Sequence, residues 1–341
     1  MLTRIFTLLL LILACHTWAA DDFYSARIPV ADRSESSLNT GAKLALERVL
    51  IRISGDDRIA ENPNVAAAIV TARERIALYA YEQEEAQTVL RVSFDDVLIK
   101  GILRESDATF WATPRPPVLL WLVIDEPFSR RFATVSQDED LLQALSNAFA
   151  DRGVTLRLPL LDLEDAAALT PEMVWQTVLG RIRSASERYA TEHILVGRYV
   201  QLTSGMQVAE WLYLDEDGQR REQLQGTDSI PVILGGVDLA VDAMADRYAV
   251  ALQSRPVTGA IAVSISGIES YSDYQNVMGL LRGIPILDSV TVTEVSQDVL
   301  VVKVTGIGSA EALARTLPNR SRLAMAADPT PSRLTLHWGQ P

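Results

Sequence analysis

Val118-Leu119-Leu120-Trp121-Leu122-Val123-Ile124 is a continuous apolar run with two prolines before it and two acids, Asp125 and Glu126, after it. A strand with one face in water alternates apolar and polar residues, whereas an unbroken run of this length is typical of a strand that is covered on both faces. We therefore expect this run to lie inside a mixed sheet.

The residues on the C-terminal side of this run continue the same domain. Apolar spacing predicts a helix near residues 141–149, a strand at 154–158, and a longer helix that starts at Thr170-Pro171-Glu172 and buries residues up to Ile182. Residues 193–226 contain three strand patterns separated by turns, and a closing helix follows at 237–252. This order predicts a central mixed α/β domain over residues 117–253 with a three-stranded meander, whose polar last strand, 219–225, lies at an exposed edge.

A proline-rich spacer at residues 111–117 separates the central domain from an N-terminal segment. This segment has strand patterns at 23–30, 76–81 and 89–94, a helical stripe at 38–53 that ends at Gly55, and a short helix pattern at 95–103. We expect an N-terminal α+β domain over residues 21–110.

A second spacer, residues 254–259, precedes a C-terminal domain over residues 259–341. Its patterns follow the order β-α-β-β-α-β, with a hairpin around Gln297-Asp298 and a last strand at 333–338. This is the order of the ferredoxin-like split unit. The fold class expected for the whole chain is α+β, multi-domain, with mixed sheets and packed helices.

Residues 1–20 have the pattern of a secretory signal peptide, with Arg4 in a short basic start, an apolar run at 5–14, and small residues at Ala19 and Ala20. The run is too short to cross a bilayer, which takes roughly 20 apolar residues. We therefore expect export to the periplasm. Cys15 follows residues that loosely resemble a lipoprotein box, so either it is discarded with the signal or it carries a lipid anchor.

The charge balance limits the classes of partner. The chain has 31 basic and 44 acidic side chains among 341 residues, a formal net charge of −13. Nucleic-acid binding depends on lysine and arginine at the phosphates, so this balance argues against a nucleic-acid partner. Attachment to a membrane is expected only if Cys15 is lipidated.

Side chains that commonly carry catalysis or bind metals are scarce. Cys15 is the only cysteine in the sequence, and His193 and His337 are the only histidines outside the signal segment. The sequence has neither a phosphate-binding glycine loop nor a histidine-based zinc spacing. We therefore assign no catalytic, cofactor-binding or metal-binding residue, and we interpret both histidines as surface or hydrogen-bonded residues.

Two pairs of residues remain as candidates for a site. Asp125 and Glu126 follow the central strand, where ligands bind open sheets, and could act as the two acids of a hydrolase. The simpler interpretation is a turn at the strand end, with Pro127 ending the ladder. Trp211 and Tyr213 share one face of a predicted strand, so they form either an exposed ligand face or a pair covered by helices.

Asp215-Glu216-Asp217-Gly218 lacks the twelve-residue ligand spacing of a calcium loop. We interpret it as a hairpin turn between the second and third strands of the meander.

Several stretches resemble an uncharacterised family of proteobacterial envelope proteins, the domain of unknown function numbered two thousand and sixty-six. They are Ala26-Arg27-Ile28-Pro29-Val30, the helix pattern at 42–53 with Arg52-Ile53-Ser54-Gly55, and the strand pattern at 263–268. The resemblance implies a Gram-negative source and periplasmic residence, and it supplies no catalytic residues. The element order around His193-Ile194-Leu195-Val196-Gly197 is similar to the N-terminal domain of the TolB translocation proteins, which implies protein binding.

The function expected from the sequence is that of a non-enzymatic interaction or assembly protein of the Gram-negative periplasm. Its expected partner is another envelope protein, with peptidoglycan as a second kind of partner. A carboxylate-dependent hydrolase that acts on an envelope polymer is the alternative.

Overall fold

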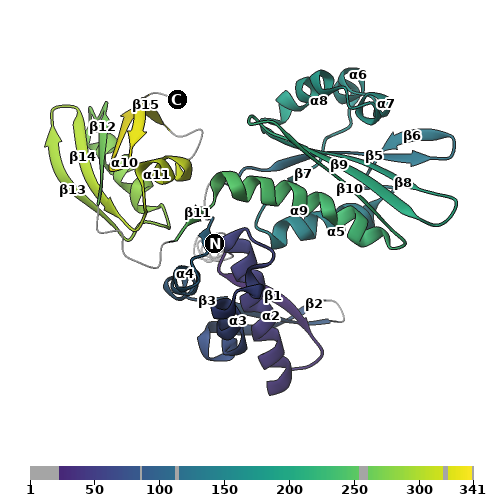
Figure 1. Cartoon of the computed structure of the whole chain (residues 1–341), viewed down its shortest axis with the longest axis horizontal. Coiled ribbons are helices and arrows are strands. Elements are labelled where there is room, and N and C mark those ends of the chain that lie inside the picture. Colours follow the sequence, from purple (N-terminus) through teal and green to yellow (C-terminus); the bar gives the residue numbers. More distant parts are fainter. Residues whose placement is uncertain (1–22, 85–86, 112–114, 253–259, 318–321, 340–341) are drawn as a thin grey trace, which may run out of the picture. The chain divides into compact units, whose positions relative to one another are not determined.

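The computed structural model describes residues 23–84, 87–111, 115–252, 260–317 and 322–339 (Figure 1). The expected signal peptide at 1–20 and Cys15 lie outside these residues. The chain divides into two compact units, one of residues 1–54 and 58–108 and one of residues 55–57 and 109–341. Both contain packed helices and mixed or antiparallel sheets, which confirms the expected multi-domain α+β class.

The first unit has a three-stranded antiparallel sheet in the order β1-β3-β2. Its elements are β1 (Ser25–Val30), α2 (Glu35–Ser54), the short helical turn η2 (Ile59–Glu61), α3 (Pro63–Val70), η3 (Ala72–Arg75), β2 (Ile76–Glu84), β3 (Gln87–Phe94) and α4 (Asp96–Glu105). Helix α2 is the predicted amphipathic helix. It ends before Gly55, whose φ of +78° favours glycine.

Helix α3 was not predicted from the sequence. Its start is nevertheless marked by Asn62-Pro63, because the Asn62 side chain accepts a hydrogen bond from the Asn64 amide and the proline occupies the first turn.

The second unit contains the central sheet, in the order β10-β9-β8-β5-β6, with β7 pairing beside the start of β5. Strand β5 pairs in parallel with β7 and β8, whereas β8, β9 and β10 form the predicted antiparallel meander. The elements are β5 (Val118–Glu126), β6 (Ser129–Phe132), α5 (Glu139–Asp151), β7 (Leu156–Arg157), α6 (Leu163–Ala168), α7 (Pro171–Trp175), α8 (Leu179–Ser186), η4 (Glu187–Tyr189), β8 (His193–Gln201), β9 (Gln207–Leu214), β10 (Gln219–Gly226) and α9 (Ser229–Tyr248). A separate two-stranded ribbon pairs β4 (Thr109–Phe110) with β11 (Val250–Ala251).

Strand β5 is covered on both faces, as its unbroken apolar run predicts. Val118, Leu120 and Leu122 belong to a core shared with α5 and α9. The alternating residues Leu119, Trp121 and Val123 belong to a second core, shared with α7 and α8. Figure 1 shows the two groups of helices on opposite sides of the sheet. Full burial of each such side chain contributes about 1.5–3 kcal/mol to folding.

Two details of the central domain differ from the prediction. Pro127 does not end the ladder, because β5 and β6 form a hairpin that pairs up to Glu126 and Ser129 around a Pro127-Phe128 turn. The helix expected from Thr170 to Ile182 is two helices, α7 and α8. Thr177, with φ of +57°, lies between them in a conformation that no helix continues.

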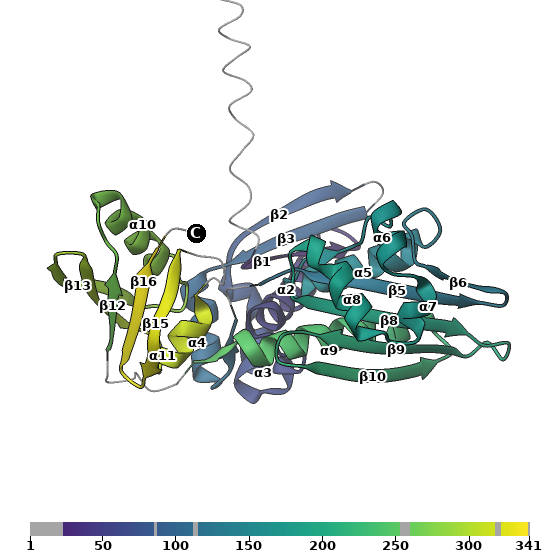
Figure 2. The ribbon, with the colours of Figure 1, turned by 90° about the horizontal axis from the view of Figure 1, so that it is seen from above.

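The C-terminal part of the second unit has a five-stranded sheet in the order β13-β14-β12-β16-β15 (Figure 2). Its elements are β12 (Ile261–Ser266), α10 (Tyr271–Arg282), β13 (Ser289–Ser296), β14 (Val299–Thr305), α11 (Ala310–Thr316), β15 (Leu323–Thr330) and β16 (Arg333–Trp338). The β-α-β-β-α order and the last strand are as predicted. Strand β15 is additional, and it pairs with β16 at the sheet edge through two register shifts.

The helices in the described part of the chain include none that is long and apolar enough to cross a membrane.

Candidate functional site

The segment from the end of β7 to the first residue of α6 presents leucines to solvent from a well-held backbone. We call residues 158–163, Leu158-Pro159-Leu160-Leu161-Asp162-Leu163, the leucine loop. The Leu160 side chain is 70% exposed and the Leu163 side chain 91% exposed. Single exposed apolar residues are ordinary, but two on one short loop call for a physical account of what holds them there.

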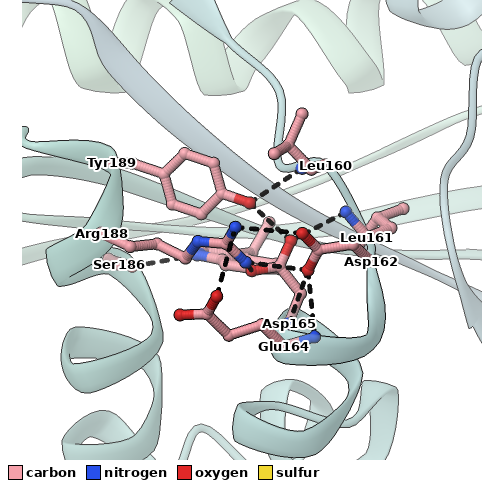
Figure 3. Close-up of polar contacts among 9 residues, drawn as sticks. Leu160, Leu161, Asp162, Glu164, Asp165, Ser186, Arg188 and Tyr189 are labelled. Carbon is pink, nitrogen blue, oxygen red and sulfur yellow. Dashed lines mark hydrogen bonds and ion pairs between the residues drawn. The ribbon is translucent and has the colours of Figure 1, made fainter.

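A buried carboxylate holds the middle of the leucine loop. Asp165 in α6 is only 1% exposed. Its Oδ2 atom accepts a hydrogen bond from the backbone N–H of Leu161, over 2.8 Å, and another from the Tyr189 hydroxyl, over 2.5 Å (Figure 3). A buried carboxylate is costly unless it is paired in this way, so Asp165 ties α6, η4 and the leucine loop together.

Tyr189 extends the same contact to the next residue. Its hydroxyl donates to Asp165 and accepts from the backbone N–H of Leu160, over 2.8 Å. Burial, and after it the hydrogen bond to Asp165, raises the pKa of Tyr189. The hydroxyl therefore keeps the proton that it donates. The backbone amides of Leu160 and Leu161 are thus both fixed by buried side chains.

Arg188 pairs with the acids around the leucine loop. Its Nη1 atom donates to Asp162 Oδ1 over 2.8 Å and to Asp165 Oδ1 over 3.0 Å, and its Nη2 atom donates to Asp162 Oδ2 over 3.0 Å. Asp162 also caps α6, where Oδ1 accepts from the amides of Glu164 and Asp165. The Arg188 hydrogen bond lowers the pKa of Asp162 to about 2.

The backbone of the leucine loop is held in a conformation that leucine rarely adopts. Leu161 has φ of +53°, in the left-handed region, which costs about 1–2 kcal/mol for a residue with a Cβ atom. Such a conformation persists only where the surroundings fix it, and here the Asp165 carboxylate binds the Leu161 amide directly.

The support beneath the loop reaches the central strand. The Trp121 indole of β5 donates to Ser186 Oγ over 3.0 Å, and its ring meets the Tyr189 ring edge-on, with centroids 6.1 Å apart. The loop is therefore built on the core of the sheet.

The predicted ligand face of Trp211 and Tyr213 is not exposed. Both side chains are buried in the core shared with α5 and α9, and the Trp211 indole donates to the Val232 carbonyl. The interpretation of a pair covered by helices is therefore the correct one, since α9 lies over this face.

His193 is buried between two tyrosines. Its Nδ1 atom lies 2.5 Å from the Tyr213 hydroxyl and its Nε2 atom 2.9 Å from the Tyr248 hydroxyl. Burial, assisted by the charge of Arg247, lowers the pKa of His193 to about 4. The ring is therefore neutral at pH 7 and is a hydrogen-bonded core residue. His337 is exposed, and its Nδ1 atom lies 3.0 Å from Ser266 Oγ.

Asp125 and Glu126 do not face each other. They are neighbours in β5, so their side chains point to opposite faces of the sheet. Asp125 pairs with Arg130 over 2.9 Å and Glu126 with Arg131 over 2.7 Å. The two acids therefore brace the β5–β6 hairpin.

The Asp215 turn is a hairpin turn, as interpreted. The Gly218 amide donates to Asp215 Oδ1 over 2.9 Å, and β9 and β10 pair on either side. Within the described ranges, no group of three or more histidine, cysteine or acidic side chains is arranged to hold a metal ion.

The leucine loop was not predicted from the sequence. The available signal was the dense apolar segment at 158–163, which contains Pro159 and the capping aspartate Asp162. Loops normally run over the protein surface, and the sequence does not show which of these leucine side chains face solvent.

Comparisons with known proteins reach only part of the chain. Residues 18–112 match the family model described as a domain of unknown function (DUF8605). No curated protein matches the chain. The leucine loop lies outside the matched segment.

Proposed function

We propose that this chain is a non-enzymatic interaction protein of the Gram-negative envelope, and that it docks onto a folded partner protein through the leucine loop. The observation that carries the proposal is the exposure of Leu160 and Leu163 on a backbone whose amides are bound by Asp165 and Tyr189.

The energetics favour docking by such a loop. Burying a leucine side chain in a partner contributes about 1.5–3 kcal/mol. Ordering a flexible loop upon binding would consume part of this gain, whereas a loop that is already fixed avoids that cost. The buried hydrogen bonds beneath Leu160 and Leu161 supply this preorganisation.

The charges around the leucine loop indicate the chemistry of the partner. Glu164 and Asp162 lie beside Leu163, and the Glu164 side chain is mostly exposed. Asp162 is ionised at physiological pH, because its pKa is lowered to about 2. We infer a partner with an apolar groove that is rimmed by lysine or arginine, which would steer toward this chain of net charge −13.

The envelope location in this proposal comes from residues 1–20 and their signal-peptide pattern. A protein partner fits the leucine loop better than peptidoglycan does, because leucine side chains offer no hydrogen bonds to sugar hydroxyls.

Site-specific photocrosslinking in a Gram-negative host tests the proposal. A photoreactive residue replaces Leu163 in one variant and Leu78, which is 69% exposed in β2 of the first unit, in the matched control. The expected result is a discrete protein adduct for position 163 that is absent for position 78.

The partner in the adduct is then identified and its structure inspected for a basic-rimmed apolar groove. Equal adducts at both positions, or none at position 163, would contradict docking through the leucine loop.

A further inference from the structure

A pair of stacked tyrosines stands on the surface of the C-terminal domain. Tyr271 opens α10 and is 75% exposed. Its ring stacks on that of Tyr274, with centroids 6.0 Å apart and planes 21° apart. One face of the Tyr271 ring therefore contacts Tyr274, and the high exposure of Tyr271 places the rest of the ring in water.

The first turn of α10, which carries this pair, is anchored from below. Ser270 Oγ accepts from the Asp273 amide and donates to Asp273 Oδ2 over 2.7 Å. The Trp338 indole of β16 donates to Asp273 Oδ1 over 2.8 Å, and the Arg322 guanidinium lies over the Trp338 ring. The helix turn that carries the tyrosine pair is thus anchored to strand β16.

One amide side chain lies next to the rings on the same helix. Gln275 Nε2 donates to the Tyr271 hydroxyl over 2.5 Å, and the Gln275 side chain is exposed. Its amide keeps a further N–H and a carbonyl oxygen with which it can bind a ligand.

We propose that Tyr271, Tyr274 and Gln275 form a platform for a neutral glycan that contains N-acetylhexosamine. The face of an aromatic ring is electron-rich and attracts the polarised C–H groups on the flat side of a pyranose. The neighbouring Gln275 amide matches the donors and acceptors of sugar hydroxyls and of the N-acetyl group.

The net charge of the chain, −13, disfavours phosphate-bearing or strongly anionic ligands such as nucleic acids. The platform is a site separate from the leucine loop, and it goes beyond the proposed docking function. It would give a protein-binding chain a second contact, with the glycan strands of an envelope polymer.

Titration of the purified full chain with tetra-N-acetylchitotetraose, followed by isothermal calorimetry or by NMR, tests this inference. The expected result is saturable binding with a Kd of about 1 mM or tighter. Tyr271→Ala should weaken it at least about tenfold, whereas Tyr271→Phe should keep it within about threefold because the ring is retained. Tyr79→Ala, at an exposed tyrosine of β2, and Leu163→Asp should bind as the parent does.

Three results would overturn the inference. They are the absence of saturable binding up to about 10 mM, unchanged binding by Tyr271→Ala, and equal losses from Tyr79→Ala. Equal affinity for cellotetraose, which lacks N-acetyl groups, would overturn the role of the Gln275 amide. Leu163→Asp changes only the leucine loop. Loss of the protein adduct with glycan binding retained, or the reverse, therefore shows which of the two sites has failed.

Discussion

The Tyr189 hydroxyl donates a hydrogen bond to Asp165 Oδ2 over 2.5 Å and accepts one from the Leu160 amide over 2.8 Å. One phenol thereby links a buried acid to the backbone of a loop whose side chains face water. Because these groups belong to the domain core, they fix the loop that exposes Leu160 and Leu163.

Removing that hydroxyl should destabilise the central domain. Tyr189→Phe leaves the Leu160 amide without its acceptor and Asp165 without one of its donors. Each unsatisfied buried group costs about 1–3 kcal/mol, so we expect a loss of about that size in the free energy of unfolding. Urea denaturation measures it, with Tyr79→Phe at an exposed tyrosine as the control that should change stability by less than about 0.5 kcal/mol.

Amide hydrogen exchange gives a local readout of the same variant. The exchange of the Leu160 and Leu161 amides should accelerate in Tyr189→Phe more than that of amides in β8. Uniform acceleration through the domain would mean that the hydroxyl acts on global stability alone.

Two glycine substitutions should have opposite effects. A Cβ atom on Gly236 of α9 would lie 2.5 Å from Trp211 Cδ2, whereas a Cβ atom on Gly101 of α4 meets nothing within 4 Å. Gly236→Ala should therefore cost about 1–3 kcal/mol through overpacking. Gly101→Ala should stabilise by about 0.5–1 kcal/mol through helix propensity. Thermal unfolding of both variants checks the signs, and a stabilising Gly236→Ala would refute the close packing of α9 on β9.

His193 should make the protein less stable in mild acid. Its folded pKa of about 4 lies below the ordinary value of 6.5, chiefly because of burial. Above pH 6.5 the ring is neutral in both the folded and the unfolded state, so its protonation does not change the free energy of unfolding. As pH falls from 6.5 toward 4, His193 becomes protonated in the unfolded chain but stays neutral in the folded chain. The free energy of unfolding therefore falls by about 3 kcal/mol in total.

The measurement is the difference in pH dependence between the parent and His193→Phe. Asp238 and Asp242 have pKa values raised by burial and act in the opposite direction, but they are present in both proteins. The variant should lose the slope between pH 6.5 and 4.5 whatever its absolute stability. An unchanged slope would show that His193 is not the group that titrates.

The sequence predicted those parts of the fold that depend on local pattern. The run from Val118 to Ile124 specifies burial on both faces, and its neighbours in sequence alternate between the two cores. Apolar residues spaced three and four positions apart likewise predicted α2 and α9, because such spacing places them on one buried face of a helix.

The candidate site could not be predicted, because it depends on contacts between residues far apart in sequence. Asp165 and Tyr189 are 24 positions apart, and the Leu160 amide reaches a hydroxyl 29 positions away. Strand β6 was missed because four residues give too short a pattern, and β15 because Asp328 and Pro329 interrupt it.

The most direct test of docking through the leucine loop is the yield of the photocrosslinked adduct at position 163 when Leu160 is changed to Asp. Leu78→Asp, at a leucine of nearly equal exposure in the first unit, is the matched control. Leu160→Asp should reduce the yield at least about tenfold with an unchanged Tm, because a charge on the loop cannot enter an apolar groove, and Leu78→Asp should leave the yield unchanged. An adduct that persists in Leu160→Asp at the parent's yield would contradict docking through the leucine loop.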